Sequence, residues 1–349
     1  MKMRMILGLG SAMALCVIAA GTTVAADPVA DFYKGGTITV VSGGGAGGAH
    51  GAYAQLISAR IGQFIPGRPN VVVQYMPGAG GNKAMNYLYK VTARNGNFVG
   101  VPLQDLIFNA RVGVKAVKYD AAKARYLGGV DTTRTTVTVM KSGGALTLDD
   151  AKRKEVLMAA SGRGGQTYLI PVVLNTMLGT KFRIVAGYRG LGQMHLAMEN
   201  GEVHGRAASW SSITSTKPDW VKKGLLANLV TIALEREPAL PDIPTLAELA
   251  TSEKDRTLIR FLAGSAALGR AWVSFDGIPA DRLAALRAAY ATTLADSGFK
   301  IEANKRGLPV RPIAWQDQQK IVTDILATPD AQVAQVRKFL GQLKKKKKK

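Results

Sequence analysis

The chain has 349 residues, and its 46 lysines and arginines outnumber its 24 aspartates and glutamates, which gives a formal net charge of +22. This charge suggests nucleic acid as a partner, but no run of the sequence interleaves basic with aromatic residues, which argues against that class. Cys16 is the only cysteine, so the sequence excludes a disulfide framework and a metal site built from several cysteines.

The first residues have the pattern of a secretory signal. Lys2 and Arg4 precede an apolar run from Met5 to Ala20, and small residues follow as far as Ala26. We expect export to the periplasm with cleavage near Ala26, which removes the one cysteine. The alternative is an uncleaved membrane anchor, although the apolar run is short for a span of roughly 20 residues. Export is a second argument against nucleic acid as a partner.

Strand and helix patterns alternate along the rest of the chain. In chain order, the first set is a strand over 36–43, a helix over 50–65, a strand over 70–76, a helix over 81–91 and a strand over 97–103. The second set is strands over 135–141 and 155–161, a helix over 167–178, a strand over 181–188, a helix over 192–201 and a strand over 228–234. This alternation predicts mostly parallel sheets covered by helices.

The end of the chain reads as helical. Helices are predicted over 278–298, 315–326 and 332–343, and Lys344–Lys349 are expected to form a disordered, solvated tail. In the earlier helix over 167–178, we expect Pro171 in the first turn, where its missing N–H costs nothing. A mature chain of this length is expected to form two domains.

A glycine-rich turn follows the first predicted strand. Gly43, Gly45 and Gly48 satisfy G-x-G-x-x-G, the pattern of a dinucleotide-binding loop. Such a loop also needs an acidic residue about 20 residues later, and no Asp or Glu occurs from Phe32 through Gln104. No G-K-[ST] follows the glycines either, so NAD and a P-loop nucleotide are both disfavoured, and we expect no cofactor.

The same turn suits an anionic ligand. Glycines between a strand and a helix let backbone N–H groups approach a ligand, and the helix N-terminus adds partial positive charge. Three further turns of this kind occur over 76–83, 160–168 and 187–193. Four such turns favour a clamp for carboxylate or phosphate. The alternative is that they only connect strands to helices.

Candidate catalytic groups are sparse. His50, His195 and His204 are the only histidines, and none has partners at the spacing that a zinc site requires. His195 and Glu199 lie one helical turn apart, and we expect them on a solvated helix face. No G-x-S-x-G nucleophile motif occurs. We therefore expect a protein that is not an enzyme and holds no metal.

Several segments resemble one known family, the periplasmic substrate-binding proteins of tripartite tricarboxylate transporters, also called Bug receptors. The segments are "IPGRPNVVVQYMPGAGGNKAMNYLY", "AGYRGLGQMHLAMENGEVHG", "PALPDIPTLAELA" and "SWSS". The resemblance implies an α/β protein with the type II periplasmic-binding-protein fold, in which a ligand cleft lies between two α/β lobes. It places lobe 1 at 27–130 and 235–343 and lobe 2 at 131–234.

The resemblance also implies a function. The protein would capture a small organic carboxylate and deliver it, as a monomer, to integral-membrane transporter subunits. A ligand sensor for a signalling partner and, less favoured, an enzyme on the same fold are the alternatives. Many members of the family carry an acidic residue and an arginine just after the first glycine turn. Here those positions are Gly51 and Gln55, which disfavours a ligand with an amino group.

The glycine turns and the resemblance together predict the ligand-binding residues. His50 would either donate to the anion or lie exposed at a helix start, and Trp210 would either line the cleft or pack between the lobes. The predicted residues are Ser42, Gly43, Gly44, Gly45, Gly47, Gly48, His50, Gly80, Gly81, Ser161, Gly162, Arg163, Gly164, Gly165, Gln166, Thr167, Tyr188, Arg189, Ser209 and Trp210.

Overall fold

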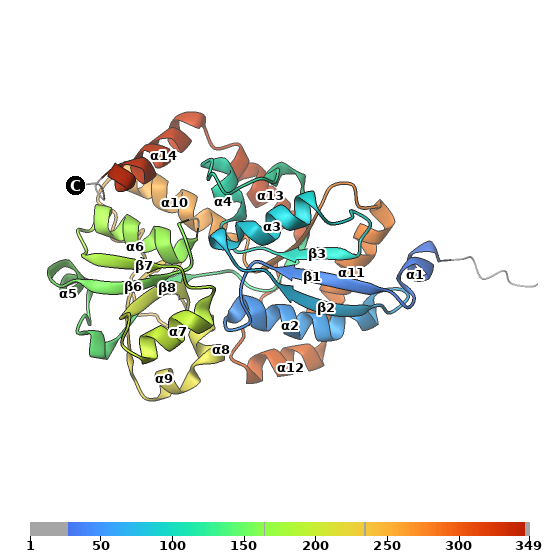
Figure 1. Ribbon diagram of the computed structural model, residues 1–349, viewed down its shortest axis with the longest axis horizontal. Coiled ribbons are helices and arrows are strands. Elements are labelled where there is room, and N and C mark those ends of the chain that lie inside the picture. Colours follow the sequence, from blue (N-terminus) through green and yellow to red (C-terminus); the bar gives the residue numbers. More distant parts are fainter. Residues whose placement is uncertain (1–26, 164, 234, 346–349) are drawn as a thin grey trace, which may run out of the picture.

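The fold consists of two five-stranded sheets, each covered by helices (Figure 1). The computed structural model describes residues 27–163, 165–233 and 235–345. The predicted signal over 1–26, Gly164, Leu234 and the last four lysines therefore lie outside the described residues.

The first sheet places the glycine turns at one edge. Its strand order is β2-β1-β3-β10-β4, in which β10 runs antiparallel to β3 and β4 and the pairs of β1 with β2 and β3 are parallel. Ser42, at the end of β1, pairs with Tyr75 of β2 and Val101 of β3, so three carboxyl ends meet there. The strands are β1 (Thr37–Ser42), β2 (Asn70–Tyr75), β3 (Phe98–Val101), β4 (Ala124–Gly129) and β10 (Ala271–Phe275).

The second sheet repeats the plan of the first. Its order is β7-β6-β8-β5-β9, with β6 parallel to β7 and β8, and β5 antiparallel to β8 and β9. Each sheet thus has one antiparallel strand in the fourth position, supplied by the segment that enters from the other lobe. The strands are β5 (Thr135–Met140), β6 (Val156–Ala160), β7 (Phe182–Ala186), β8 (Gly205–Ser209) and β9 (Leu226–Ile232). The predicted fold class, two α/β lobes of the type II periplasmic-binding-protein fold, is confirmed.

Helices cover both sheets, and within the described ranges none is long and apolar enough to cross a bilayer. The helices that precede β5 are α1 (Pro28–Tyr33), α2 (Ala49–Ile61), α3 (Asn82–Lys90) and α4 (Leu106–Arg111). Between β5 and β9 lie α5 (Leu148–Arg153), α6 (Gln166–Met177), α7 (Leu191–Glu199), α8 (Ser211–Thr216) and α9 (Pro218–Lys222). After β9 come α10 (Glu253–Ala267), α11 (Ala280–Ala295), α12 (Ser297–Lys305), α13 (Trp315–Leu326) and α14 (Asp330–Lys345). Short 3-10 turns are η1 (Gly62–Phe64), η2 (Ala79–Gly81), η3 (Ala121–Lys123) and η4 (Lys141–Gly143).

Capping side chains and a glycine account for three of these helix ends. Thr147 and Asp150 form a reciprocal capping box at the start of α5, and Ser252 accepts a backbone hydrogen bond at the start of α10. Gly201, which has a φ of 74°, follows α7 where the sequence predicts its end.

Two sequence predictions about helices are wrong. Pro171 is the sixth residue of α6, which begins at Gln166, so it lies beyond the first turn and the hydrogen bond from residue 171 to the Thr167 carbonyl cannot form. Helix α14 continues through Lys345, so the first two lysines of the predicted tail are helical.

The apolar core joins the two lobes. One cluster of buried residues extends from Val41 and Phe108 in the first lobe to Val156 and Ile170 in the second. Helix α10 contributes Phe261, whose ring lies 5.2 Å from that of Phe108. The two lobes therefore share packed apolar surface.

A buried ion pair lies where the chain passes from the first sheet to the second. Asp131, just after β4, is 3.2 Å from the Arg270 guanidinium and 2.7 Å from that of Arg311. The side chains of Asp131 and Arg270 are 3% and 1% exposed. Arg270 also donates to the hydroxyls of Ser209 (2.9 Å) and Ser211 (2.6 Å), in the second lobe. Segments far apart in sequence are thus tied at one point.

Asp131→Asn should lower the free energy of unfolding by about 3 kcal/mol, because it leaves the buried Arg270 cation without its carboxylate. Urea unfolding followed by circular dichroism measures this loss. Asp149→Asn is the matched control, since Asp149 is exposed and forms its ion pair with Lys152 on its own helix, and it should leave stability unchanged. Equal effects of the two variants would contradict this assignment.

Candidate functional site

A cavity of about 80 Å³ lies between the two lobes, at the carboxyl ends of the parallel strands. This is where open α/β sheets bind ligands. Twelve of the predicted residues line it, namely Gly43, Gly44, Gly45, Gly48, His50, Gly81, Ser161, Gly165, Gln166, Thr167, Arg189 and Ser209. The cavity thus brings together predicted residues from all four glycine turns.

The turn between β1 and α2 presents free backbone donors. The N–H of Gly43 donates to the Val101 carbonyl (2.9 Å) and that of Gly44 to the Ser42 hydroxyl (3.3 Å). In the described part of the chain, the N–H groups of residues 45–48 have no partner. Gly48 is the N-cap of α2 and makes no side-chain cap. The first turn of α2 and the loop before it can therefore donate to an anion.

The structure gives a reason for glycine at position 51, where the resemblance leads one to expect an acidic residue. A Cβ at this position would lie 2.4 Å from the Gly45 carbonyl oxygen and 2.7 Å from the Ala46 Cα. The loop folds closely over the first turn of α2, so no side chain fits there.

His50 is buried rather than exposed at the helix start. Its side chain lines the cavity with a residue exposure of 8%, and its Nε2 has no hydrogen-bond partner among the described residues. Burial, together with the nearby Arg270 charge, lowers the pKa of His50 to about 3. The imidazole is therefore neutral at physiological pH and can donate to a ligand through one ring nitrogen.

The turn between β6 and α6 is held largely by its own hydrogen bonds. The N–H of Ser161 donates to the Thr167 hydroxyl (3.1 Å), and that of Gly165 to the Gly162 carbonyl (3.1 Å). The Ser161 and Thr167 hydroxyls lie 3.2 Å apart. Gly162 and Arg163 belong to this turn but do not line the cavity, and Gly164 lies outside the described residues.

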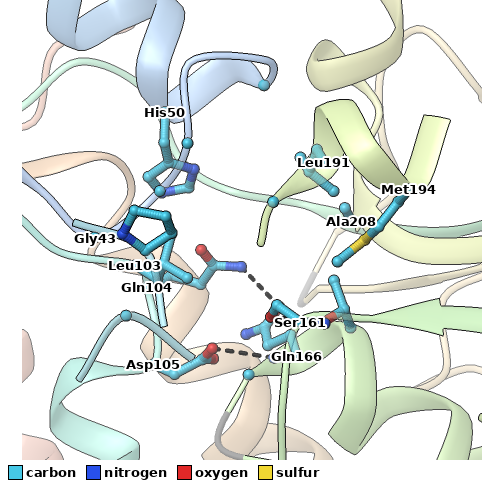
Figure 2. A pocket seen from close by; sticks show the side chains of 18 of the residues that line it. Gly43, His50, Leu103, Gln104, Asp105, Ser161, Gln166, Leu191, Met194 and Ala208 are labelled. Carbon is cyan, nitrogen blue, oxygen red and sulfur yellow. Dashed lines mark hydrogen bonds between the residues drawn. The ribbon is translucent and has the colours of Figure 1, made fainter. Parts of the chain in front are cut away.

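Two residues that the sequence analysis missed reach this turn from the first lobe (Figure 2). Asp105 Oδ2 accepts a hydrogen bond from the Gln166 N–H (3.1 Å), the first residue of α6. Gln104 Nε2 donates to Gln166 Oε1 (3.0 Å), which also accepts from the Thr135 hydroxyl. Gln104 and Asp105 follow β3, so their place at a strand's carboxyl end was the available signal.

Burial changes the acidity of Asp105. The residue is 2% exposed, and desolvation raises the pKa of its carboxyl to about 7, against the smaller opposite effect of its hydrogen bonds from Gln166. Tyr119, whose pKa burial raises, lies near enough to interact with this charge. Asp105 therefore changes charge near neutral pH.

The glycines bring the lobes into contact around the cavity. A Cβ on Gly47 would lie 2.8 Å from the Gly192 Cα, and one on Gly45 would lie 3.9 Å from the Gly190 Cα. On the other side, a Cβ on Gly165 would lie 3.5 Å from the Gly80 Cα. Turns from opposite lobes thus meet backbone to backbone.

The other predicted residues lie behind the lining. Trp210 is buried at the N-cap of α8, so its alternative role in packing fits the structure and its role in lining the cleft does not. Tyr188 packs against the apolar cluster that contains Met194 and Trp220. Among described residues, Ser42, Gly47, Gly80, Tyr188 and Trp210 do not line the cavity. The missed lining residues are Pro77, Gly78, Leu103, Gln104, Asp105, Thr133, Gly190, Leu191, Met194, Ala207 and Ala208.

His195 is not on a solvated face, which corrects the sequence expectation. It is 1% exposed, stacks edge-on to Trp220 and accepts a hydrogen bond from Arg206 Nε (3.2 Å). Glu199, one helical turn from His195, pairs with Lys217 (2.6 Å). Burial lowers the pKa of His195 to about 3, so it acts as a neutral acceptor that supports Arg206. Across the described ranges, no group of three or more His, Cys, Asp or Glu side chains is placed to hold a metal ion.

Asp105→Asn should stabilise the protein more at high pH than at low pH. The folded state holds the Asp105 proton up to about pH 7, while the unfolded state releases it near its ordinary pKa, so the wild-type protein loses stability as pH rises between these values. Thermal melts of both proteins at about pH 5 and about pH 8 measure this loss of wild-type stability. It amounts to about 1.4 kcal/mol for each unit by which the pKa of Asp105 differs between the folded and unfolded states. Asp317→Asn, at an exposed position on α13, should show no such pH dependence. A Tm difference between Asp105→Asn and wild type that is independent of pH would contradict the assignment.

Comparisons with known proteins agree with this architecture. No family model matches the chain, and no curated protein sequence matches it. Among solved structures, the periplasmic binding protein BugD has a TM-score of 0.70 at 17% identity, covering 88% of this chain and 99% of its own.

Two structures from Rhodopseudomonas palustris are similar and carry ligands. MatC with bound malate has a TM-score of 0.66 at 21% identity, covering 85% of this chain and 98% of its own. Rpa4515 with adipate has a TM-score of 0.67 at 22% identity, covering 87% and 97%. At these identities the likeness shows the fold, and the chain has the two-lobed α/β fold of these periplasmic binding proteins.

Proposed function

We propose that this protein is a periplasmic solute receptor that captures a small organic carboxylate between its lobes. It would deliver the ligand to the integral-membrane subunits of a tripartite tricarboxylate-type transporter, as a monomer and without chemical change to the ligand. The likeness to BugD, and to MatC and Rpa4515 with their dicarboxylates, supports this class of function.

One observation carries the proposal, namely unpartnered polar atoms around the cavity. His50 Nε2, Gln104 Oε1 and Thr133 Oγ1 are buried atoms of lining residues, and the described part of the chain offers them no hydrogen bond. Unsatisfied buried polar atoms are costly. A polar ligand in the cavity would satisfy them.

Positive charge near the cavity favours an anion. Arg206, which directly precedes the lining residues Ala207–Ser209, is fully buried, and its partners within the described ranges, His195, Ser212 and the Ser209 carbonyl, are all neutral. Burial lowers the pKa of Arg206 to about 9, which still leaves it charged at neutral pH. A buried cation without a carboxylate is stabilised by an anion nearby.

The lobe limits are part of the proposal. We place lobe 1 at 27–130 and 235–343 and lobe 2 at 131–234, with rotation about the crossing at Asp131. Opening would separate the paired glycine turns, and closing over a carboxylate would bring the free N–H groups of residues 45–48 onto it. The predicted signal over 1–26 agrees with a periplasmic location.

A thermal-shift screen of small carboxylic acids and their amides on the purified protein tests the function. A carboxylate at about 100 times its dissociation constant should add roughly 2.7 kcal/mol of stability, and the amide should add much less. Chelator should leave the shift unchanged. Stabilisation by NAD, with no response to any carboxylate, would show the proposal to be wrong.

Gly47→Ala should weaken ligand binding about tenfold, or about 1.4 kcal/mol, because its Cβ would collide with the Gly192 backbone of the other lobe in the closed form. Isothermal titration with a carboxylate found in the screen measures the change. Gly264→Ala on α10 is the matched control, since Gly264 does not line the cavity and the nearest atom to its Cβ would lie 3.9 Å away, at ordinary contact distance. If both variants bind as wild type does, closure at this pair of turns is not required for binding.

A further inference from the structure

The two helix N-termini beside the cavity differ in what already occupies them. At α2, no side chain caps the helix and the loop donors at 45–48 are unpartnered within the described chain. At α6, the first backbone N–H, that of Gln166, is already bonded to Asp105 (3.1 Å), a carboxyl from the opposite lobe. One anion-binding end is therefore open to a ligand and the other holds the protein's own carboxyl.

The Gln166 side chain reinforces this arrangement. It is 5% exposed, and its amide oxygen accepts hydrogen bonds from Gln104 and Thr135. Asp105 and Gln104 are adjacent in the first lobe, so both hold the same residue of the second lobe (Figure 2). A ligand carboxylate at the start of α6 would have to displace Asp105 or lie beside it. Like charges at close range repel strongly in a buried site.

Much of the remaining wall is apolar. Leu103, Leu191, Met194, Ala207 and Ala208 line the cavity together with the glycine turns. The alkyl or aryl body of a ligand can pack on these side chains, whereas a second carboxylate there would lose its hydration. The unpartnered His50 Nε2 belongs to α2, at the same end as the free loop donors.

We infer that the site takes a monocarboxylate with an apolar body, and that Asp105 is the residue that selects against a second carboxylate. This inference rests on the proposed function. The carboxylate binds to the N–H groups of residues 45–48 and the start of α2. The body extends along Leu103 and Met194 toward Asp105, which accepts or donates one hydrogen bond but repels an anion when ionised.

The charge of Asp105 adds a pH dependence. Its pKa lies at about 7, so lowering the pH neutralises the carboxyl and removes the repulsion. Other titratable or charged groups lie near Asp105 or the cavity. Tyr119, whose pKa is raised, interacts with Asp105, while Arg189 and His50, which stays neutral, line the cavity. Asp105 is thus the group among these whose charge changes between about pH 6 and about pH 8.

Matched ligand pairs of equal carbon number test the inference. Isothermal titration of the wild-type protein would compare butyrate with succinate, and hexanoate with adipate. The best monocarboxylate should bind about tenfold more tightly than its partner dicarboxylate at about pH 8. The preference should decrease at about pH 6, because Asp105 is then mostly protonated.

Asp105→Asn provides the second arm. It keeps an oxygen that can accept from the Gln166 N–H but removes the charge, so the preference for the monocarboxylate should fall and lose its pH dependence. Asp317→Asn, which changes an exposed carboxylate on α13, should retain the wild-type preference. Thermal melts of each variant establish that it is folded.

The outcomes separate the inference from the proposed function. If wild-type protein binds the dicarboxylate of each pair as tightly as the monocarboxylate, or more tightly, the inference is wrong while the receptor function stands. If no carboxylate of either kind binds, the proposed function fails and the inference fails with it. Should Asp105→Asn not fold, the wild-type pairs at the two pH values still decide the matter.

Discussion

The buried pair of Asp131 and Arg270 is the constraint on which the two-lobed arrangement depends. Asp131 lies where the chain leaves the first sheet after β4, and Arg270 lies where the chain re-enters that sheet at β10. Arg270 also holds Ser209, which lines the cavity. Because one guanidinium bonds the crossing and the cavity wall, the geometry of the site is set by the same contact that joins the lobes. Buried charges of this kind tolerate few alternative partners.

The glycine turns serve two physical purposes that the sequence does not separate. Some leave backbone donors free, as at residues 45–48. Others allow main chains of opposite lobes to touch, as between Gly47 and Gly192 or Gly80 and Gly165. Both purposes need a residue without Cβ, so composition alone predicts a glycine-rich edge without showing which glycine faces a ligand and which faces the other lobe.

Desolvation governs the ionisable groups around the cavity. Burial lowers the pKa of His50 to about 3 and raises that of Asp105 to about 7. Both shifts favour the neutral form, since the interior solvates charge poorly. Binding an anion in such surroundings depends on preorganised N–H donors and on residual positive charge such as that of Arg206, whose pKa is lowered only to about 9.

The sequence by itself determined the strands and helices with strong local patterns, including β1, α2 and α13, and the alternation that defines the fold class. It did not reveal β8, because Gly205–Ser209 contains no β-branched residue. It predicted the turns at the site but missed Asp105, which meets Gln166 across 61 residues of chain. It also placed His195 on the surface. Only the tertiary structure decided these points, because burial and pairing between distant segments depend on which surfaces pack together, and local periodicity carries no information about that.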